Sequence, residues 1–282
     1  MIVVKEFPDR QFNNKQELFT ALRENKHDII ATKKMIVKEA DAIIYLPSVS
    51  SDKGQTLKAE ETNLTDINKI QAKLVINTTL LMDSHTDVHL NGIWKKSVKE
   101  TKTPYLLQEH KMTFDHIISD NVKASVSLMP WTDLGFNYPG STEALVFDAT
   151  ISKDRNEFMF NQYAKGYVKE HSVGMRYVKI ELGINSDNRY DEEEKKVWDK
   201  YIDLVVNKDL AEERGYAWFV HEAKIIEGSA VVKGSNFATP TISVEAAGST
   251  STKKEPPSGT QTIKTVKGKI PNNQMYNFFK NL

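Results

Sequence analysis

Short segments in which apolar and polar residues alternate recur between residues 70 and 232, and they limit the folds open to this chain more than any other feature. The first alternates through Ile70, Ala72 and Leu74, which predicts a strand over 70–82. Glycine- and proline-containing loops separate such segments. The same reasoning predicts strands at 103–112, 122–131, 143–151, 174–184 and 216–232, and a buried strand at 40–49 that ends at Pro47.

Helical periodicity marks four further segments. The clearest is 152–171, for which Ser152 is the expected N-cap. Its apolar stripe consists of Phe160, Tyr163, Ala164, Tyr167 and Val168. Helices are also expected in 14–30, 93–100 and 188–207. In the last of these Asp191 and Glu194 have the spacing of a capping box, and the acidic run is interpreted as a solvated first turn rather than a metal site.

Composition excludes several classes of protein. Apolar residues make up 39% and charged residues 27% of the 282 residues, which suits one large globular domain or one domain with appendages. The 38 basic and 38 acidic residues give no net charge, so no nucleic-acid or membrane partner is expected. The absence of cysteine excludes disulfides, thiolate zinc sites and a cysteine nucleophile. The first residues do not resemble a signal peptide, and no apolar run is long enough to span a bilayer.

A serine nucleophile needs a base and a group that orients the base. Ser172, in the segment HSVGMRYVK (171–179), is a candidate nucleophile, although a serine there can also be a simple helix-end residue. His171 is a poor base for it, because neighbours on an extended backbone face opposite ways. His110, which follows the apolar run YLLQ, is better placed at the edge of a strand.

The segment HTDVH (85–89) offers a different chemistry. On a strand His85, Asp87 and His89 would share one face and suit zinc or iron(II), as in a metal hydrolase. The turn-forming residues on both sides argue against that strand. The chain contains no G-x-S-x-G elbow, no P-loop and no glycine-rich dinucleotide turn.

Three stretches together resemble the tailed-phage prohead proteases, the serine proteases that mature capsids. They are DSHTDVHLNGIWKKSVK followed by YLLQEHKMTFDHIISD, then AKGYVKEHSVGMRYV, then FVHEAKIIEGSAVVKGSNFATP. The resemblance implies that Ser172 is the nucleophile, His110 the base and Glu227 the third catalytic member, with His221 as the alternative third member. Amides near Gly174 are candidate oxyanion donors. Neither a cofactor nor a metal is expected.

The resemblance also implies an α+β fold, mainly an antiparallel β-barrel with flanking helices, like that of the related herpesvirus maturation protease (assemblin). The implied activity is endopeptidase cleavage of scaffold and major capsid protein precursors, and of the protease itself, inside the assembling prohead in the host cytoplasm. The alternative is a catalytically inactive capsid-assembly or scaffold protein that keeps the protease fold.

The expected organisation has four parts. These are an N-terminal extension of unknown role (1–70), the protease domain (71–245, with 188–207 as a helical insert), a flexible linker (246–271) and a short C-terminal docking segment (272–282). The chain departs from the family pattern in four ways. Ser172 and Glu227 are 55 residues apart (227 − 172), which is longer than expected and is accounted for by the helical insert. Asn91 replaces a usual proline, Gly228-Ser229-Ala230 replaces bulkier residues, and the first 70 residues have no counterpart in the family.

Overall fold

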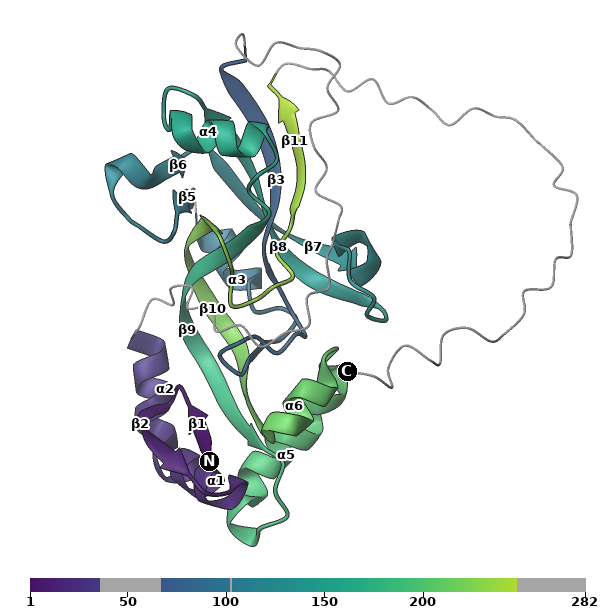
Figure 1. Cartoon of the computed structure of the whole chain (residues 1–282). Coiled ribbons are helices and arrows are strands. Elements are labelled where there is room, and N and C mark those ends of the chain that lie inside the picture. Colours follow the sequence, from purple (N-terminus) through teal and green to yellow (C-terminus); the bar gives the residue numbers. More distant parts are fainter. Residues whose placement is uncertain (36–66, 102, 248–282) are drawn as a thin grey trace, which may run out of the picture. The chain divides into compact units, whose positions relative to one another are not determined.

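Two long strands, β9 (Glu170–Ile184) and β10 (Tyr216–Val231), pair antiparallel over almost their whole length. The computed structural model describes residues 1–35, 67–101 and 103–247, which all belong to one compact unit (Figure 1). β10 also pairs in parallel with β4 (Asp87–His89) and β5 (Tyr105–Gln108), and β6 (Ile117–Ser119) extends this five-stranded sheet beyond β5.

A second, antiparallel sheet has the strand order β11-β3-β8-β7. Its strands are β11 (Thr241–Ala246), β3 (Lys69–Thr78), β8 (Ser141–Ser152) and β7 (Val122–Pro130). The two sheets pack closely at Gly228, where an added Cβ atom would lie only 2.5 Å from the Phe147 ring and 3.2 Å from Ile76. The small residue in this part of β10 is therefore required by the packing between the sheets.

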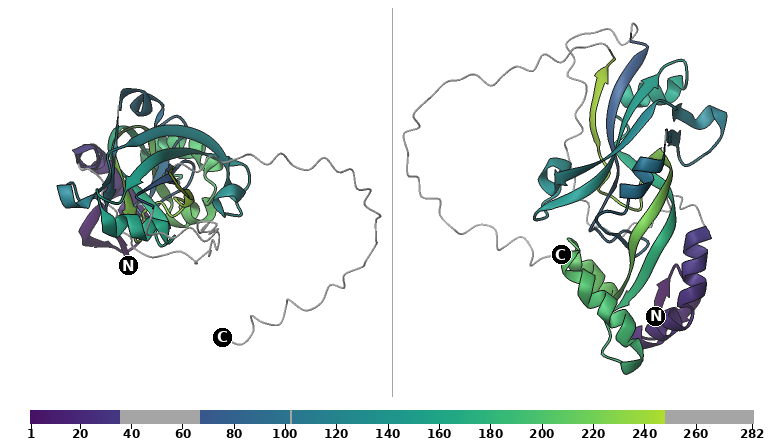
Figure 2. Two further views of the ribbon diagram at one scale, coloured as in Figure 1. Left: turned by 90° about the horizontal axis from the view of Figure 1, so that it is seen from above. Right: turned by 180° about the vertical axis from the view of Figure 1, so that it is seen from behind.

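The helices flank these sheets (Figure 2). They are α1 (Lys15–Glu24), α2 (Lys26–Met35), α3 (Lys95–Glu100), α4 (Glu157–Ala164), α5 (Glu192–Tyr201) and α6 (Lys208–Arg214). Short 3-10 turns occur at Phe114–His116, Trp131–Leu134, Arg189–Asp191 and Ile202–Leu204. None of the helices in the described residues is long and apolar enough to cross a membrane.

The α+β class is confirmed, but the closed barrel is wrong. The five-stranded and four-stranded sheets both remain open, so each keeps edge strands. The sheets do not close because their outer strands do not pair with one another. In the described residues β6 and β9 of one sheet, and β7 and β11 of the other, each pair with one strand only. At their far end β9 and β10 are covered by α2, α5 and α6 instead of by further strands (Figure 1).

Each strand expected within the described residues forms, whereas the clearest expected helix, at 152–171, is wrong at both ends. Ser152 is the last residue of β8, and Asn156 caps α4 by accepting a hydrogen bond from the Met159 amide at 3.0 Å. The helix ends before Gly166, whose φ of 69° lies in the left-handed region. Ser172 is consequently the third residue of β9, and does not end a helix.

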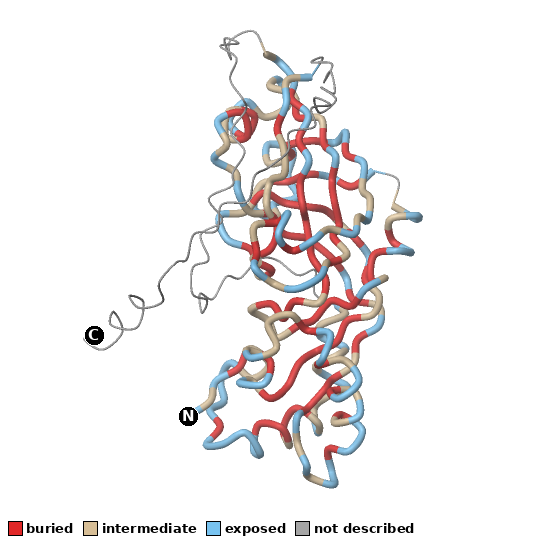
Figure 3. The backbone as a smooth tube through the Cα atoms, turned by 90° about the vertical axis from the view of Figure 1, so that its right-hand side faces the viewer, coloured by how far each residue is buried: buried red, intermediate tan, exposed pale blue. Residues whose placement is uncertain are grey.

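Residues 1–35 pack against the far end of the β9–β10 pair. They form a small antiparallel hairpin of β1 (Ile2–Val4) and β2 (Phe7–Phe12), followed by α1 and α2. The Glu6 carboxylate accepts hydrogen bonds from Trp218 Nε1 at 2.8 Å and Tyr216 OH at 3.1 Å. Lys33 Nζ lies 2.8 Å from Asp87 Oδ1 in a buried ion pair. Buried residues accordingly continue from the strands into this segment (Figure 3).

Ion pairs between α1–α2 and α5 correct the capping-box prediction. Asp191 precedes α5 but makes no capping hydrogen bond, and its carboxylate pairs with Arg23 instead. Glu194 Oε1 lies 2.5 Å from Lys26 Nζ. Both acidic side chains are buried, so this part of the acidic run is not solvated.

The strand predicted at 40–49 lies outside the described residues, as do the loop at 50–63 and the docking segment at 272–282. Only the first two residues of the predicted linker, 246 and 247, are described, and residue 246 ends β11.

Replacing Arg23 by alanine should destabilise the protein. Asp191 is fully buried, and within the described chain Arg23 binds its Oδ1 while its Oδ2 has no hydrogen-bond partner, so the substitution leaves a buried charge uncompensated. We expect a loss of about 3 kcal/mol in the free energy of unfolding, measured by urea denaturation. Lys196→Ala, which breaks an exposed pair with Glu192, is the control and should leave the transition unchanged. Equal unfolding curves for Arg23→Ala and wild type would contradict the role of the pair.

Candidate functional site

His110 lies in a turn that directly follows β5. Glu109 and His110 both have left-handed backbone conformations, with φ of 50° and 56°. This conformation is uncommon for residues other than glycine and has to be held by the surroundings. The Glu109 amide donates to the Ala230 carbonyl at 3.0 Å, and the His110 amide donates to Ser229 Oγ at 3.1 Å. The turn is thereby anchored to β10.

The imidazole of His110 and the carboxylate of Glu227 form a buried hydrogen-bonded pair. His110 Nδ1 lies 2.6 Å from Glu227 Oε1, and only 5% and 3% of the two side chains are exposed. An ionised carboxylate can only accept, so Nδ1 carries the proton and Nε2 of the neutral ring keeps a lone pair. Nε2 is buried and has no hydrogen-bond partner within the described chain.

Ser229 completes this pair from the same strand as Glu227. Its hydroxyl donates to Glu227 Oε2 at 2.6 Å while accepting from the His110 amide. Both carboxylate oxygens of Glu227 are thus hydrogen-bonded, as a buried charge requires. Sequence reasoning did not assign a role to Ser229. Its signal was the two-residue spacing from Glu227, which puts both side chains on one face of a strand.

Gly174 provides the space that the Glu227 carboxylate occupies. The two residues are paired across β9 and β10, and a Cβ atom on residue 174 would lie 1.9 Å from Glu227 Oε1. Any side chain there would displace the carboxylate. The structure therefore gives Gly174 a packing role, and the oxyanion role of the amides near it stays a prediction.

Ser172 shares a strand face with this cluster. It is paired with Ser229 across the two strands, two residues from Gly174, and is 8% exposed. Paired residues of antiparallel strands have Cβ atoms about 5 Å apart on the same face. Among the described residues, no hydrogen bond joins Ser172 to His110. The structure thus pairs His110 with Glu227 directly, and puts Ser172 on their face of the sheet without a bond to either.

His171 faces the other way, as predicted for the neighbour of Ser172. Its Nδ1 donates to the Thr239 carbonyl at 3.0 Å, and its Nε2 accepts from Tyr163 OH at 3.0 Å. Burial lowers the pKa of His171 to about 4, an effect that the hydrogen bond to Thr239 partly opposes. With both ring nitrogens engaged, His171 has no lone pair to offer Ser172.

His221 lies in a different part of β10. It is eight residues from Ser229 (229 − 221), which is roughly 25 Å along an extended strand. It contacts Glu181, and burial lowers its pKa. Of the two residues proposed as the third catalytic member, only Glu227 contacts His110.

Of the three HTDVH side chains, Asp87 and His89 both contact Tyr177 OH, whereas His85 contacts a different residue. The His85 ring contacts Lys5, Asp87 binds Lys33 and Tyr177 OH, and His89 hydrogen-bonds Asn77 and Tyr177. His85 precedes β4, so the alternation of a strand covers only Asp87 and His89. Within the described ranges, no three histidine, aspartate or glutamate side chains are grouped to hold a metal ion.

Comparisons with protein-family models, with curated proteins and with solved structures give no significant match. What the site does has to be inferred from its own geometry and chemistry.

A Gly174→Ala substitution should disrupt the His110–Glu227 pair. The added methyl group forces the carboxylate off its position, and the loss of a buried, charge-assisted hydrogen bond should cost about 2 kcal/mol of unfolding free energy. Nitrogen NMR of the His110 ring should report the broken bond at Nδ1. In a Glu227→Ala background the same substitution should cost much less, because the methyl group then has room. Equal costs in both backgrounds would contradict this account of Gly174.

Stability should fall between pH 7 and pH 5 through His171. Its pKa in the folded protein, about 4, is below the unfolded value near 6.5, so the unfolded state binds more protons as the pH falls. The stabilisation is complete above pH 6.5 and is lost as the pH falls towards 4. From pH 7 to 5 the loss should be about 2 kcal/mol. Urea denaturation of His171→Gln should show a pH-dependent loss that is smaller by about this amount, and an unchanged loss would rule out this residue as the cause.

Proposed function

We propose that this protein is a serine endopeptidase in which Ser172 is the nucleophile and His110 the general base. Glu227 orients the base and stabilises its charged form. The observation that carries the proposal is the state of His110. One ring nitrogen is bound to the buried carboxylate of Glu227, which shares a strand face with Ser172. The other is buried and has no hydrogen-bond partner among the described residues. A histidine oriented by a carboxylate is the arrangement that activates a serine.

The proposed reaction is acyl transfer. His110 Nε2 takes the hydroxyl proton of Ser172 as Oγ attacks a peptide carbonyl, and the imidazolium then gives that proton to the leaving amine. Water, deprotonated by the same nitrogen, hydrolyses the acyl-enzyme and releases Ser172. Glu227 stabilises the imidazolium, since the two are 2.6 Å apart in a buried setting. Ser172 has to come within reach of Nε2, and catalytic hydrogen bonds often tighten only when substrate binds.

The resemblance to prohead proteases extends the proposal to substrates and place of action. On this basis the enzyme cleaves scaffold and major capsid protein precursors inside an assembling prohead in the host cytoplasm, and cleaves itself within residues 246–271. The order of His110, Ser172 and Glu227 along the chain supports the extension. The open sheets depart from the closed barrel of the herpesvirus relative, so the resemblance rests on the motifs and on this pairing.

A small fluorophosphonate that labels activated serines tests the chemistry without knowledge of the substrate. Wild-type protein should be labelled at Ser172, as identified by mass spectrometry. Ser172→Ala and His110→Ala should each lower labelling by at least about a hundredfold, because nucleophile and base act as a unit. Ser125→Ala, a serine on β7 outside the site, is the matched control and should be labelled like wild type.

Co-expression with capsid and scaffold precursors tests the substrate. Wild type should process the precursors and Ser172→Ala should not. Equal processing by the two proteins would overturn the serine mechanism.

The absence of a hydrogen bond between Ser172 and His110 favours one competing function, that of an inactive capsid-assembly or scaffold protein. That protein would show no labelling and no processing, yet would still bind the precursors in a pull-down with the Ser172→Ala variant.

A further inference from the structure

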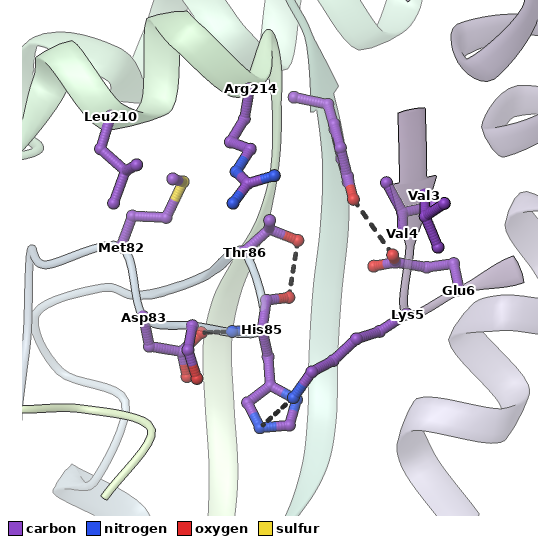
Figure 4. Close-up of a pocket in the computed structure, with 12 residues that line it drawn as sticks. Val3, Val4, Lys5, Glu6, Met82, Asp83, His85, Thr86, Leu210 and Arg214 are labelled. Carbon is purple, nitrogen blue, oxygen red and sulfur yellow. Dashed lines mark hydrogen bonds between the residues drawn. The ribbon is translucent and has the colours of Figure 1, made fainter. Parts of the chain in front are cut away.

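A cavity with a volume of about 340 Å3 is lined by residues other than the catalytic candidates Ser172, His110 and Glu227. Figure 4 shows this cavity. Its walls come from the end of β1 and the turn that follows it (residues 3–6), the loop at 82–86, and α6 with the first residue of β10. These segments are far apart in the sequence, and ligand sites favour such junctions. The volume is within the range of small-molecule pockets.

Arg214 is the most informative residue of this cavity. It is the last residue of α6, and Figure 4 shows its side chain directed from the helix into the cavity towards Thr86. Arg214 is partly buried, and its side chain forms no ion pair or hydrogen bond with the rest of the described chain. A partly buried cation is stabilised by an anion with good geometry, and guanidinium binds carboxylates in a two-pronged fashion.

The two acidic side chains of the cavity wall already accept hydrogen bonds from other residues. Glu6 accepts from Tyr216 OH and Trp218 Nε1, and Asp83 Oδ1 accepts from the amides of His85 at 2.8 Å and Asp87 at 3.0 Å. Neither carboxylate pairs with Arg214. The anion that would match this guanidinium has to come from outside the wall.

Two further groups suit an anion. Lys5 Nζ lies 3.3 Å from both ring nitrogens of His85, so a second positive charge borders the cavity. Ser84 Oγ is buried and has no hydrogen-bond partner within the described chain, which leaves a hydroxyl donor unused. The rest of the lining includes Val4, Met82 and Leu210, which are apolar.

We infer that this cavity binds a small monocarboxylate that carries an apolar chain. Arg214 binds the carboxylate, and Val4, Met82 and Leu210 contact the chain. A phosphate is disfavoured because Asp83 already occupies the loop amides at His85 and Asp87 that would cradle it. The carboxylate can belong to a free aliphatic acid or to the C-terminus of a peptide, since both present the same group.

Isothermal titration calorimetry of the full chain can test this inference. The probes are hexanoate and N-acetyl-leucine, with the uncharged hexanamide and N-acetyl-leucinamide as matched ligands and inorganic phosphate as the contrast. We expect an acid to bind at least about tenfold more tightly than its amide and more tightly than phosphate. Tighter binding of hexanoate would identify a free acid as the natural ligand, and tighter binding of N-acetyl-leucine a peptide terminus.

Variants locate the site. Arg214→Gln should weaken binding of the preferred acid by about tenfold to a hundredfold, the usual effect of losing a charge-assisted hydrogen bond. Leu210→Ser should weaken both the acid and its amide. Arg189→Gln, an arginine that stacks on Tyr190 outside the cavity, is the control and should bind like wild type. Circular dichroism checks that each variant is folded.

Three results would overturn the inference. They are equal affinity for acid and amide, unchanged affinity in folded Arg214→Gln, and no binding of either acid at millimolar concentration. None of these results depends on Ser172, so the ligand proposed for the cavity and the proposed protease activity are tested independently.

Discussion

The antiparallel pairing of β9 with β10 is the constraint on which the rest of the structure depends. At one end it aligns Ser172 with Ser229 and Gly174 with Glu227, and at the other it carries the helices and the N-terminal hairpin. Register matters here because a slip by one residue moves every side chain to the opposite face. Such a slip would put Val173 or Met175 where Gly174 now leaves room for a carboxylate. A single methyl group at that point is already incompatible with the observed position of Glu227.

Buried carboxylates join segments that are distant in sequence. Asp191, Glu194 and Asp87 are each buried, and each is paired with a cation from the first 35 residues, namely Arg23, Lys26 and Lys33. The free energy lost when a buried charge is left without its partner is much larger than the free energy gained by forming the pair. These contacts therefore hold the N-terminal segment in one arrangement. The same rule explains why Glu227 needs both His110 and Ser229.

Local pattern predicted the elements better than their ends and connections. Alternation located β3, β5, β7, β8, β9 and β10, because it reflects the burial of one face, but it did not locate β1, β2, β4, β6 or β11. It could not show that the helical stripe continuing through Tyr167 and Val168 is interrupted at Gly166, or that Ser152 still belongs to β8. Asp191 and Glu194 have the spacing of a capping box, but they pair with Arg23 and Lys26 instead. Because these partners are 168 residues away, no local pattern could predict the ion pairs. The open sheets follow from the pairing of the outer strands β6, β7, β9 and β11 with one strand each, which no local pattern contains.

The family resemblance predicted the residues of the candidate site. It did not predict the neighbouring contacts that hold them in place. The two histidines near Ser172 differ in what their ring nitrogens do. His171 is adjacent in sequence, but the alternation of β9 turns it to the far face, where Tyr163 and Thr239 occupy both nitrogens. His110 is distant in sequence, yet a left-handed turn brings its ring to Glu227 and leaves Nε2 unpartnered. An imidazole whose two nitrogens are both hydrogen-bonded cannot accept a proton without losing one of these hydrogen bonds. An imidazole with one buried nitrogen that has no hydrogen bond can accept a proton there and keep the hydrogen bond at its other nitrogen. At the Ser172 end of the β9–β10 pair, only His110 has that property.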